Sequence, residues 1–162
     1  MKRIIIYCAI LLCITLSACG PVENILSKHF EFEASDFTIL EEKDTHGGFH
    51  GDGSYYLILD CSQNADKARS IVENWTDLPL SENLHLVMYG GEKNGINYGY
   101  NFAEEAHLPE IKNGVYKFVD RYNGYLKDRS DDSEILDRSS FNFSIAVYDL
   151  DSNTLYYFEM DT

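Results

Sequence analysis

Basic residues are scarce in this sequence. Lys and Arg number 13 against 27 Asp and Glu, which gives a formal charge of −14 over 162 residues. This balance argues against nucleic acid as a partner, because phosphate binding depends on clustered Lys and Arg. A surface this acidic also repels anionic lipid headgroups, so we expect no basic patch to hold the protein on a membrane. Cations and basic proteins stay open as partners.

Long apolar runs are also scarce, and the one that stands out covers Ile4 to Leu16. A membrane-spanning helix needs about 20 apolar residues, so this run is too short to span. It follows Lys2 and Arg3 and is followed by small residues and a cysteine, a pattern typical of a secretory signal. We therefore expect export.

The run ends in Leu16-Ser17-Ala18-Cys19, which resembles the lipobox of bacterial lipoproteins. The resemblance implies a signal peptide over residues 1–18, cleavage before Cys19, and acyl chains such as palmitate on the Cys19 sulfur. Two or more acyl chains anchor a protein stably, whereas one is marginal. The expectation is a protein anchored to the extracytoplasmic face of the cell membrane through Cys19. A plain cleaved signal, with Cys19 as an ordinary thiol, is the alternative.

Cysteine is rare in the rest of the chain. Cys8 and Cys13 lie in the expected signal and Cys19 would carry lipid, so Cys61 would be the single free thiol. An intrachain disulfide is then excluded, and the hydrophobic core must hold the fold together. Cys61 lies between an expected strand and an expected helix without any nucleophile signature around it. We expect a buried cysteine that acts as a small hydrophobe.

Aromatic residues are abundant, with 12 Tyr and 9 Phe, which favours a sheet. The segments predicted to be strands are 35–42, 54–61, 83–89, 115–119, 141–148 and 154–160. The first two are expected to pair as a hairpin, and so are the last two. The main predicted helix runs from Asn64 to Trp75, because its apolar residues recur at three- and four-residue spacing. Segments 90–105 and 120–138 are predicted to be loops, the second a mobile one.

These elements predict an α+β fold, a single domain with a mostly antiparallel sheet of five to seven strands and one main helix packed on a face. A short tether over residues 19–29 is expected to lead into a globular part over residues 30–162. The order strand, helix, strand over residues 54–89 leaves two topologies open, a parallel βαβ crossover and an antiparallel return.

Four segments together resemble a family of small, uncharacterised lipoproteins of Gram-positive bacteria. They are the lipobox, Asp44–Gly53, Met88–Gly95 and Asp151–Phe158. The resemblance covers nearly the whole mature chain. Because that family has no assigned activity, the resemblance implies a location and no catalytic residue.

A glycine-rich loop contains His46, His50 and Asp52. Two imidazoles and a carboxylate suit zinc or another transition metal. The helical His-Glu-x-x-His motif is not present, because Gly47 and Gly48 occupy its interior. We favour the simpler interpretation, a hairpin loop with solvated histidines, and keep the metal site as the minority hypothesis.

Two further segments carry candidate binding residues. Tyr89, Tyr98 and Tyr100 lie among glycines, where aromatic rings can stack on a sugar or a partner protein, or can simply cover the edge of the sheet. Asp149, Asp151 and Asn153 match the first positions of a calcium loop, but the glycine and the final glutamate of that motif are missing. A polar hairpin turn is the better interpretation of residues 149–153.

Two classes of function remain. The leading prediction is a non-enzymatic binding or interaction module with no cofactor, whose partner is an envelope protein or a small ligand. A structural or inhibitory protein acting on a neighbouring envelope protein has the same sequence features. The alternative is a metal-dependent cell-surface hydrolase with His46, His50 and Asp52 as ligands and Glu104 or Glu105 as the base.

Overall fold

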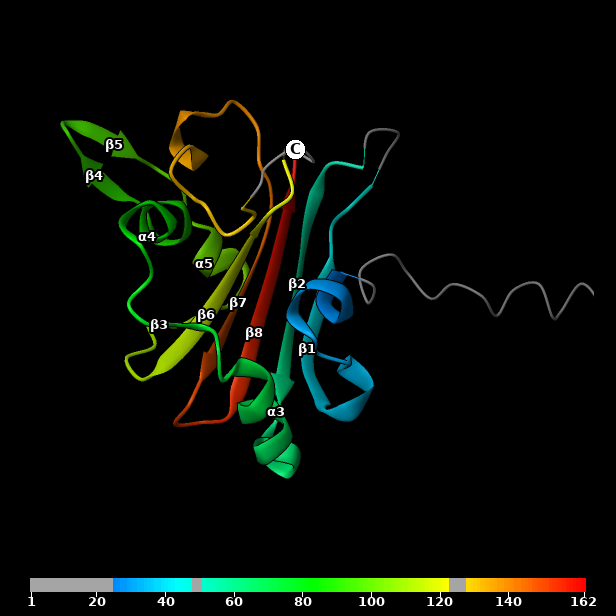
Figure 1. Cartoon of the computed structure of the whole chain (residues 1–162). Coiled ribbons are helices and arrows are strands. Elements are labelled where there is room, and N and C mark those ends of the chain that lie inside the picture. Colours follow the sequence, from blue (N-terminus) through cyan, green and yellow to red (C-terminus); the bar gives the residue numbers. More distant parts are fainter. Residues whose placement is uncertain (1–24, 48–50, 123–127) are drawn as a thin grey trace, which may run out of the picture.

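A six-stranded antiparallel sheet forms the centre of the molecule (Figure 1). The computed structural model describes residues 25–47, 51–122 and 128–162. The sheet has the order β1-β2-β8-β7-β6-β3. Its strands are β1 (Thr38–Asp44), β2 (Gly53–Asp60), β3 (Thr76–Asp77), β6 (Gly114–Asp120), β7 (Asn142–Asp149) and β8 (Thr154–Asp161). The predicted α+β class and antiparallel sheet are confirmed, as are the β1–β2 and β7–β8 hairpins.

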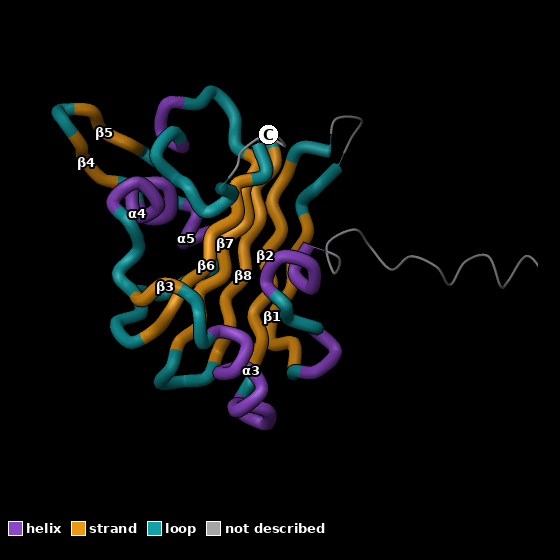
Figure 2. The backbone as a smooth tube through the Cα atoms, viewed as in Figure 1, coloured by secondary structure: helices purple, strands orange, loops and turns teal. Residues whose placement is uncertain are grey.

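Helices cover both faces of the sheet (Figure 2). The central strands are therefore buried on both sides, and they read as almost continuous apolar runs. In β2, for example, Tyr56 and Ile58 belong to one core while Tyr55 and Leu57 belong to the other. The fold thus has two hydrophobic cores separated by the sheet.

The first core is covered by α4 (Glu82–Tyr89), α5 (Phe102–Glu105) and η5 (Ile135–Asp137). The prediction of a strand over residues 83–89 is wrong, because this segment is helix α4. A short apolar run is compatible with the periodicity of a strand and with that of a helix. Here Leu84, Val87 and Met88 recur at helical spacing and are buried. Ser81 caps the helix by accepting a hydrogen bond from the Leu84 amide.

This correction also changes the topology that the sequence left open, because residues 83–89 are not the strand that follows the helix. The strand that follows α3 is β3, which pairs with β6 and lies at the edge of the sheet opposite β1. Each of the four neighbouring pairs from β2 to β3 is antiparallel, so β2 and β3 run in the same direction, and β2–α3–β3 is a crossover between parallel strands that are not neighbours in the sheet.

The second core is covered by η2 (Leu26–Phe30), by Ala34 of η3 (Ala34–Asp36) and by α3 (Ala65–Val72), whereas η4 (Ser62–Asn64), which precedes α3, is exposed. The predicted helix from Asn64 to Trp75 is present as α3, but α3 ends at Val72. Trp75 packs against Phe30, with ring centroids 6.0 Å apart. Leu26 and Phe30 are fully buried, so packing begins within the segment expected to be a tether.

Segment 90–105, which we predicted to be a loop, contains regular structure. It forms a small hairpin of β4 (Gly91–Lys93) and β5 (Ile96–Tyr98), followed by α5. Asn94 and Gly95 make the turn with φ values of 54° and 78°, and Asn-Gly is a favoured pair for such a turn. The hairpin projects beyond the body of the sheet (Figure 2).

The described end of segment 120–138 is packed, although the sequence predicted a mobile loop. Ile135 is fully buried in the first core. Arg138 forms an ion pair with Asp120, whose side chain has no exposed surface. An apolar anchor and a buried charge pair therefore fix this polar segment on the sheet.

Candidate functional site

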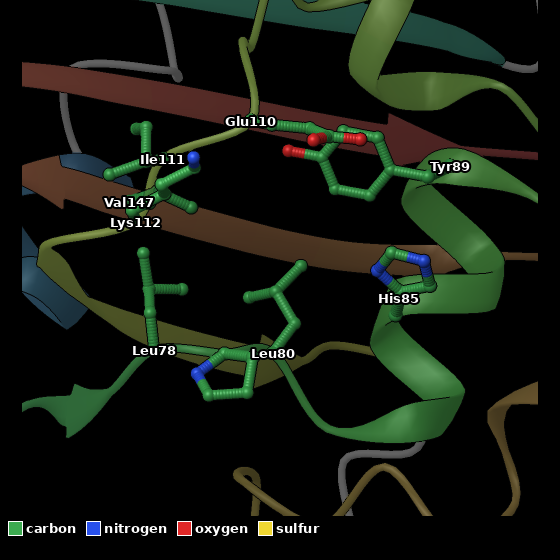
Figure 3. A pocket seen from close by; sticks show the side chains of 9 residues that line it. Leu78, Leu80, His85, Tyr89, Glu110, Ile111, Lys112 and Val147 are labelled. Atoms are coloured by element: carbon green, nitrogen blue, oxygen red, sulfur yellow. The ribbon is translucent and has the colours of Figure 1, made fainter.

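A pocket of about 220 Å³ lies between α4 and the sheet (Figure 3). Four chain segments form it: the turn after β3, helix α4, the segment that leads into β6, and strand β7. Its lining residues are Leu78, Pro79, Leu80, His85, Tyr89, Glu110, Ile111, Lys112 and Val147. Because α4 had been predicted as a strand, sequence reasoning had no means of bringing these segments together.

The aromatic wall of the pocket comes from α4. The rings of His85 and Tyr89 stack with their centroids 5.2 Å apart, since they are four residues apart on one helix face. The Tyr89 hydroxyl donates a hydrogen bond of 3.1 Å to the Pro109 carbonyl. Burial, with a smaller contribution from Glu110, raises the pKa of Tyr89 to about 12. The phenol therefore stays neutral at physiological pH and serves as a fixed wall.

Two opposite charges lie at the opening of the pocket. Glu110 and Lys112 are both exposed and flank Ile111. Within the described residues, neither takes part in an ion pair. Each is thus available to a ligand or a partner.

The chemistry of this pocket favours binding. Leu78, Leu80, Ile111 and Val147 supply apolar surface, and His85, Tyr89, Glu110 and Lys112 supply the polar groups. An apolar recess with a few polar groups around it is the usual form of a binding site.

The three candidate tyrosines have different positions. Tyr89 lines the pocket, whereas Tyr98 and Tyr100 do not. Tyr100 stacks on Phe102 at 5.8 Å and meets Phe141 edge to face at 5.1 Å, and Tyr98 lies 6.3 Å from Tyr100. Tyr98 and Tyr100 therefore continue the aromatic packing of the first core outward along the hairpin.

His46 of the predicted metal site is already engaged. Its Nδ1 lies 2.7 Å from an Asp44 oxygen and its Nε2 lies 3.2 Å from an Asp161 oxygen. A metal bound at either ring nitrogen of His46 would replace one of these two contacts. His50 lies outside the described residues, and among those described no three His, Cys, Asp or Glu side chains group as metal ligands. The metal site stays a prediction.

The two carboxylates considered as a base are held by hydrogen bonds. Glu105 accepts a hydrogen bond from the Ser54 hydroxyl, and Glu104 accepts one from the Asn101 amide. Ser54 is in turn hydrogen-bonded to Thr45, the neighbour of His46. Glu105 therefore does lie near the base of the His46 loop.

Cys61 is fully buried, as predicted. Burial raises the pKa of its thiol to about 12, so the thiolate is scarce at neutral pH. The turn over residues 149–153 is also confirmed as a polar turn. The oxygens of Asp149 accept hydrogen bonds from the Asp151 amide and the Ser152 hydroxyl, and the Asn153 oxygen accepts one from Arg69.

Sequence reasoning missed a buried polar network at one end of the sheet. Arg121 donates to Ser144 and forms ion pairs with Glu159 at 3.4 Å and Asp161 at 3.0 Å. Glu159 is 1% exposed, and burial raises its pKa, although the Tyr157 hydroxyl and Arg121 oppose this effect. The signal available in the sequence was Glu159, a carboxylate that interrupts the apolar run of strand β8.

None of the described helices has both the length and the apolar composition of a membrane span. Comparison with models of protein families, with curated proteins and with solved structures finds no match to this chain.

Proposed function

We propose that this protein is a lipid-anchored extracytoplasmic binding protein whose pocket beside α4 accepts one apolar side chain of a partner. The lipobox supports the location. The single observation that carries the binding role is the apolar pocket with Tyr89 as its wall and Glu110 and Lys112 at its opening.

The volume of the pocket suits a single side chain. An engineered apolar cavity of about 150 Å³ holds a benzene molecule, so a pocket of about 220 Å³ has room for a leucine or phenylalanine side chain. Buried apolar anchors of this kind carry much of the energy at protein interfaces.

The charges at the opening define the neighbours of that anchor. Glu110 favours a basic group and Lys112 an acidic group, and the two flank Ile111 in the sequence. A peptide segment with an apolar residue between charges of both signs is the complementary partner. The same charges disfavour a purely hydrocarbon ligand.

The test is a titration of the ¹⁵N-labelled chain from Gly20 to Thr162 with N-acetyl-leucinamide, followed by amide chemical shifts. We expect saturable shifts at Leu80, His85 and Ile111, and none with N-acetyl-serinamide, which has the same backbone without the apolar side chain. Leu80→Glu is expected to abolish the response, because it places a charge in the recess.

Leu40→Glu is the matched control, since Leu40 is 58% exposed on β1 and is not a lining residue of the pocket. This variant should respond as the wild type does. Equal shifts with the two amides, or shifts that avoid the pocket, would contradict the proposed function.

A further inference from the structure

The outer edge of β6 is only partly covered. The edge strand β3 pairs with just two of its residues, Thr76 with Tyr116 and Asp77 with Val115. At one end of β6 the Leu78 amide donates to the Gly114 carbonyl at 3.0 Å. At the other end the Asp120 amide donates to the Arg129 carbonyl at 2.6 Å. Between Thr76 and Arg129, no segment among residues 25–47, 51–122 and 128–162 pairs with this edge.

The backbone of Phe118 faces this opening. The N–H and C=O groups of one strand residue point to the same side, and successive residues alternate. Gly114 and Asp120 bond outward, so Tyr116 and Phe118 must point outward too. The alternate residues confirm this, because Asn113 and Arg121 bond to the other side, to Leu150 and Asn142. In the described part of the chain, no strand pairs with Phe118 on the outer side of β6.

A pocket of about 340 Å³ lies at the same place. We call it the β6 slot. Its lining residues are Glu31, Ser70, Ile71, Asn74, Trp75, Thr76, Tyr116, Lys117, Phe118 and Ser130. Hydroxyl, amide and charged groups thus surround an outward-facing backbone pair. The β6 slot shares no lining residue with the pocket beside α4.

One cationic side chain lies at the β6 slot, although the protein as a whole is acidic. Lys117 lines the slot, and its Nζ lies 6.0 Å from the centre of the Phe30 ring. The nearby His29 has its pKa lowered by burial first and then by Lys28, Arg129, Arg121 and Lys117. Glu31 is the one carboxylate among the lining residues. A local cation in an acidic protein favours an anionic group at this place.

The open edge is short. From Tyr116 to Asp120 a strand advances about 13 Å at roughly 3.3 Å per residue. β3 closes one end and Arg129 closes the other. A peptide strand that continues past both ends of this stretch of β6 does not fit. The last few residues of a peptide chain do fit.

We propose that the β6 slot binds the carboxyl-terminal end of a peptide, which pairs in extended form with the Phe118 backbone and places its terminal carboxylate near Lys117. Main-chain hydrogen bonds would supply part of the affinity, as in other cases of strand addition. The lysine would supply the preference for a free carboxyl end.

The first test needs no ligand. In the chain from Gly20 to Thr162, the Phe118 amide should exchange with solvent about 100-fold faster than the amides of Lys117 and Val119, which face β7. Addition of acetyl-trialanine with a free carboxylate should slow the exchange of Phe118 alone. A Phe118 amide that is already protected in the free protein would overturn the proposal.

The second test uses Trp75, the only tryptophan in the chain, as a fluorescent reporter inside the slot. Acetyl-trialanine should give a saturable change, and its carboxyl-terminal amide should bind about tenfold more weakly. Lys117→Gln should remove this difference, whereas Lys43→Gln, on β1 and outside both pockets, should preserve it. Equal binding of acid and amide, no response at all, or an equal response to acetate would each overturn the proposal.

Discussion

Arg138→Met tests whether residues 128–138 are part of the folded structure. The Asp120 side chain is completely buried and Arg138 is 9% exposed, so the variant leaves a buried carboxylate without its counter-charge. One hydrogen bond, from the Tyr122 amide at 2.9 Å, remains to Asp120. Breaking a buried pair in this way costs about 3–5 kcal/mol, a large fraction of the 5–15 kcal/mol that typically stabilises a domain.

Urea unfolding followed by circular dichroism measures this loss. Asp120→Asn in the Arg138→Met background should recover most of it, because the amide carries no charge and keeps the hydrogen bond from Tyr122. Lys67→Met is the matched control, since Lys67 pairs with Asp36 on the surface with side chains 53% and 32% exposed. That loss should stay below about 1 kcal/mol. If Arg138→Met and Lys67→Met cost the same small amount, the charge pair is solvated and segment 128–138 is not fixed on the sheet.

Three further predictions concern the anchor, the thiol and the buried carboxylate. Cys19→Ala should move the protein from the membrane fraction to the soluble fraction, because the acyl chains have no attachment point; retention in the membrane fraction would refute the anchor. The Cys61 thiol should resist a thiol reagent at pH 8 in the native protein and react fully in urea, since it is buried and its pKa is raised to about 12. Rapid labelling of the native protein would show that it is accessible. Burial raises the pKa of Glu159 in the folded state, so its contribution to the free energy of unfolding is full below its unfolded pKa of about 4.3 and is lost as pH rises through the raised folded value. Stability of Glu159→Gln relative to the wild type should therefore rise from pH 4 to pH 8, and a constant difference would show that this pKa is not raised.

Three of the strands predicted from sequence combine a clear local pattern with burial. β2, β7 and β8 are rich in aromatic and β-branched residues along their whole length, and turn residues bound each hairpin. The prediction failed at α4, where a short apolar run suits a helix and a strand equally well. The Ser81 cap was the local signal that favoured a helix.

The candidate sites were less predictable than the fold. Tyr89 was a candidate from its sequence neighbours, but its partners in the pocket, Leu80 and Lys112, come from segments on either side of it in the chain. The β6 slot needs even more of the structure, since it depends on how far β3 extends along β6. No local sequence pattern specifies the residue at which the pairing of two strands ends.

The sequence by itself determined the α+β class, the two hairpins and the buried state of Cys61, because each depends on composition or on periodicity over a few residues. It also carries the lipobox, whose consequence stays a prediction. Only the tertiary structure decided which face of α4 borders a pocket, where β6 is left open, and how Arg138 neutralises Asp120. These features join residues distant in the chain, and their positions follow from the packing of both cores against one sheet.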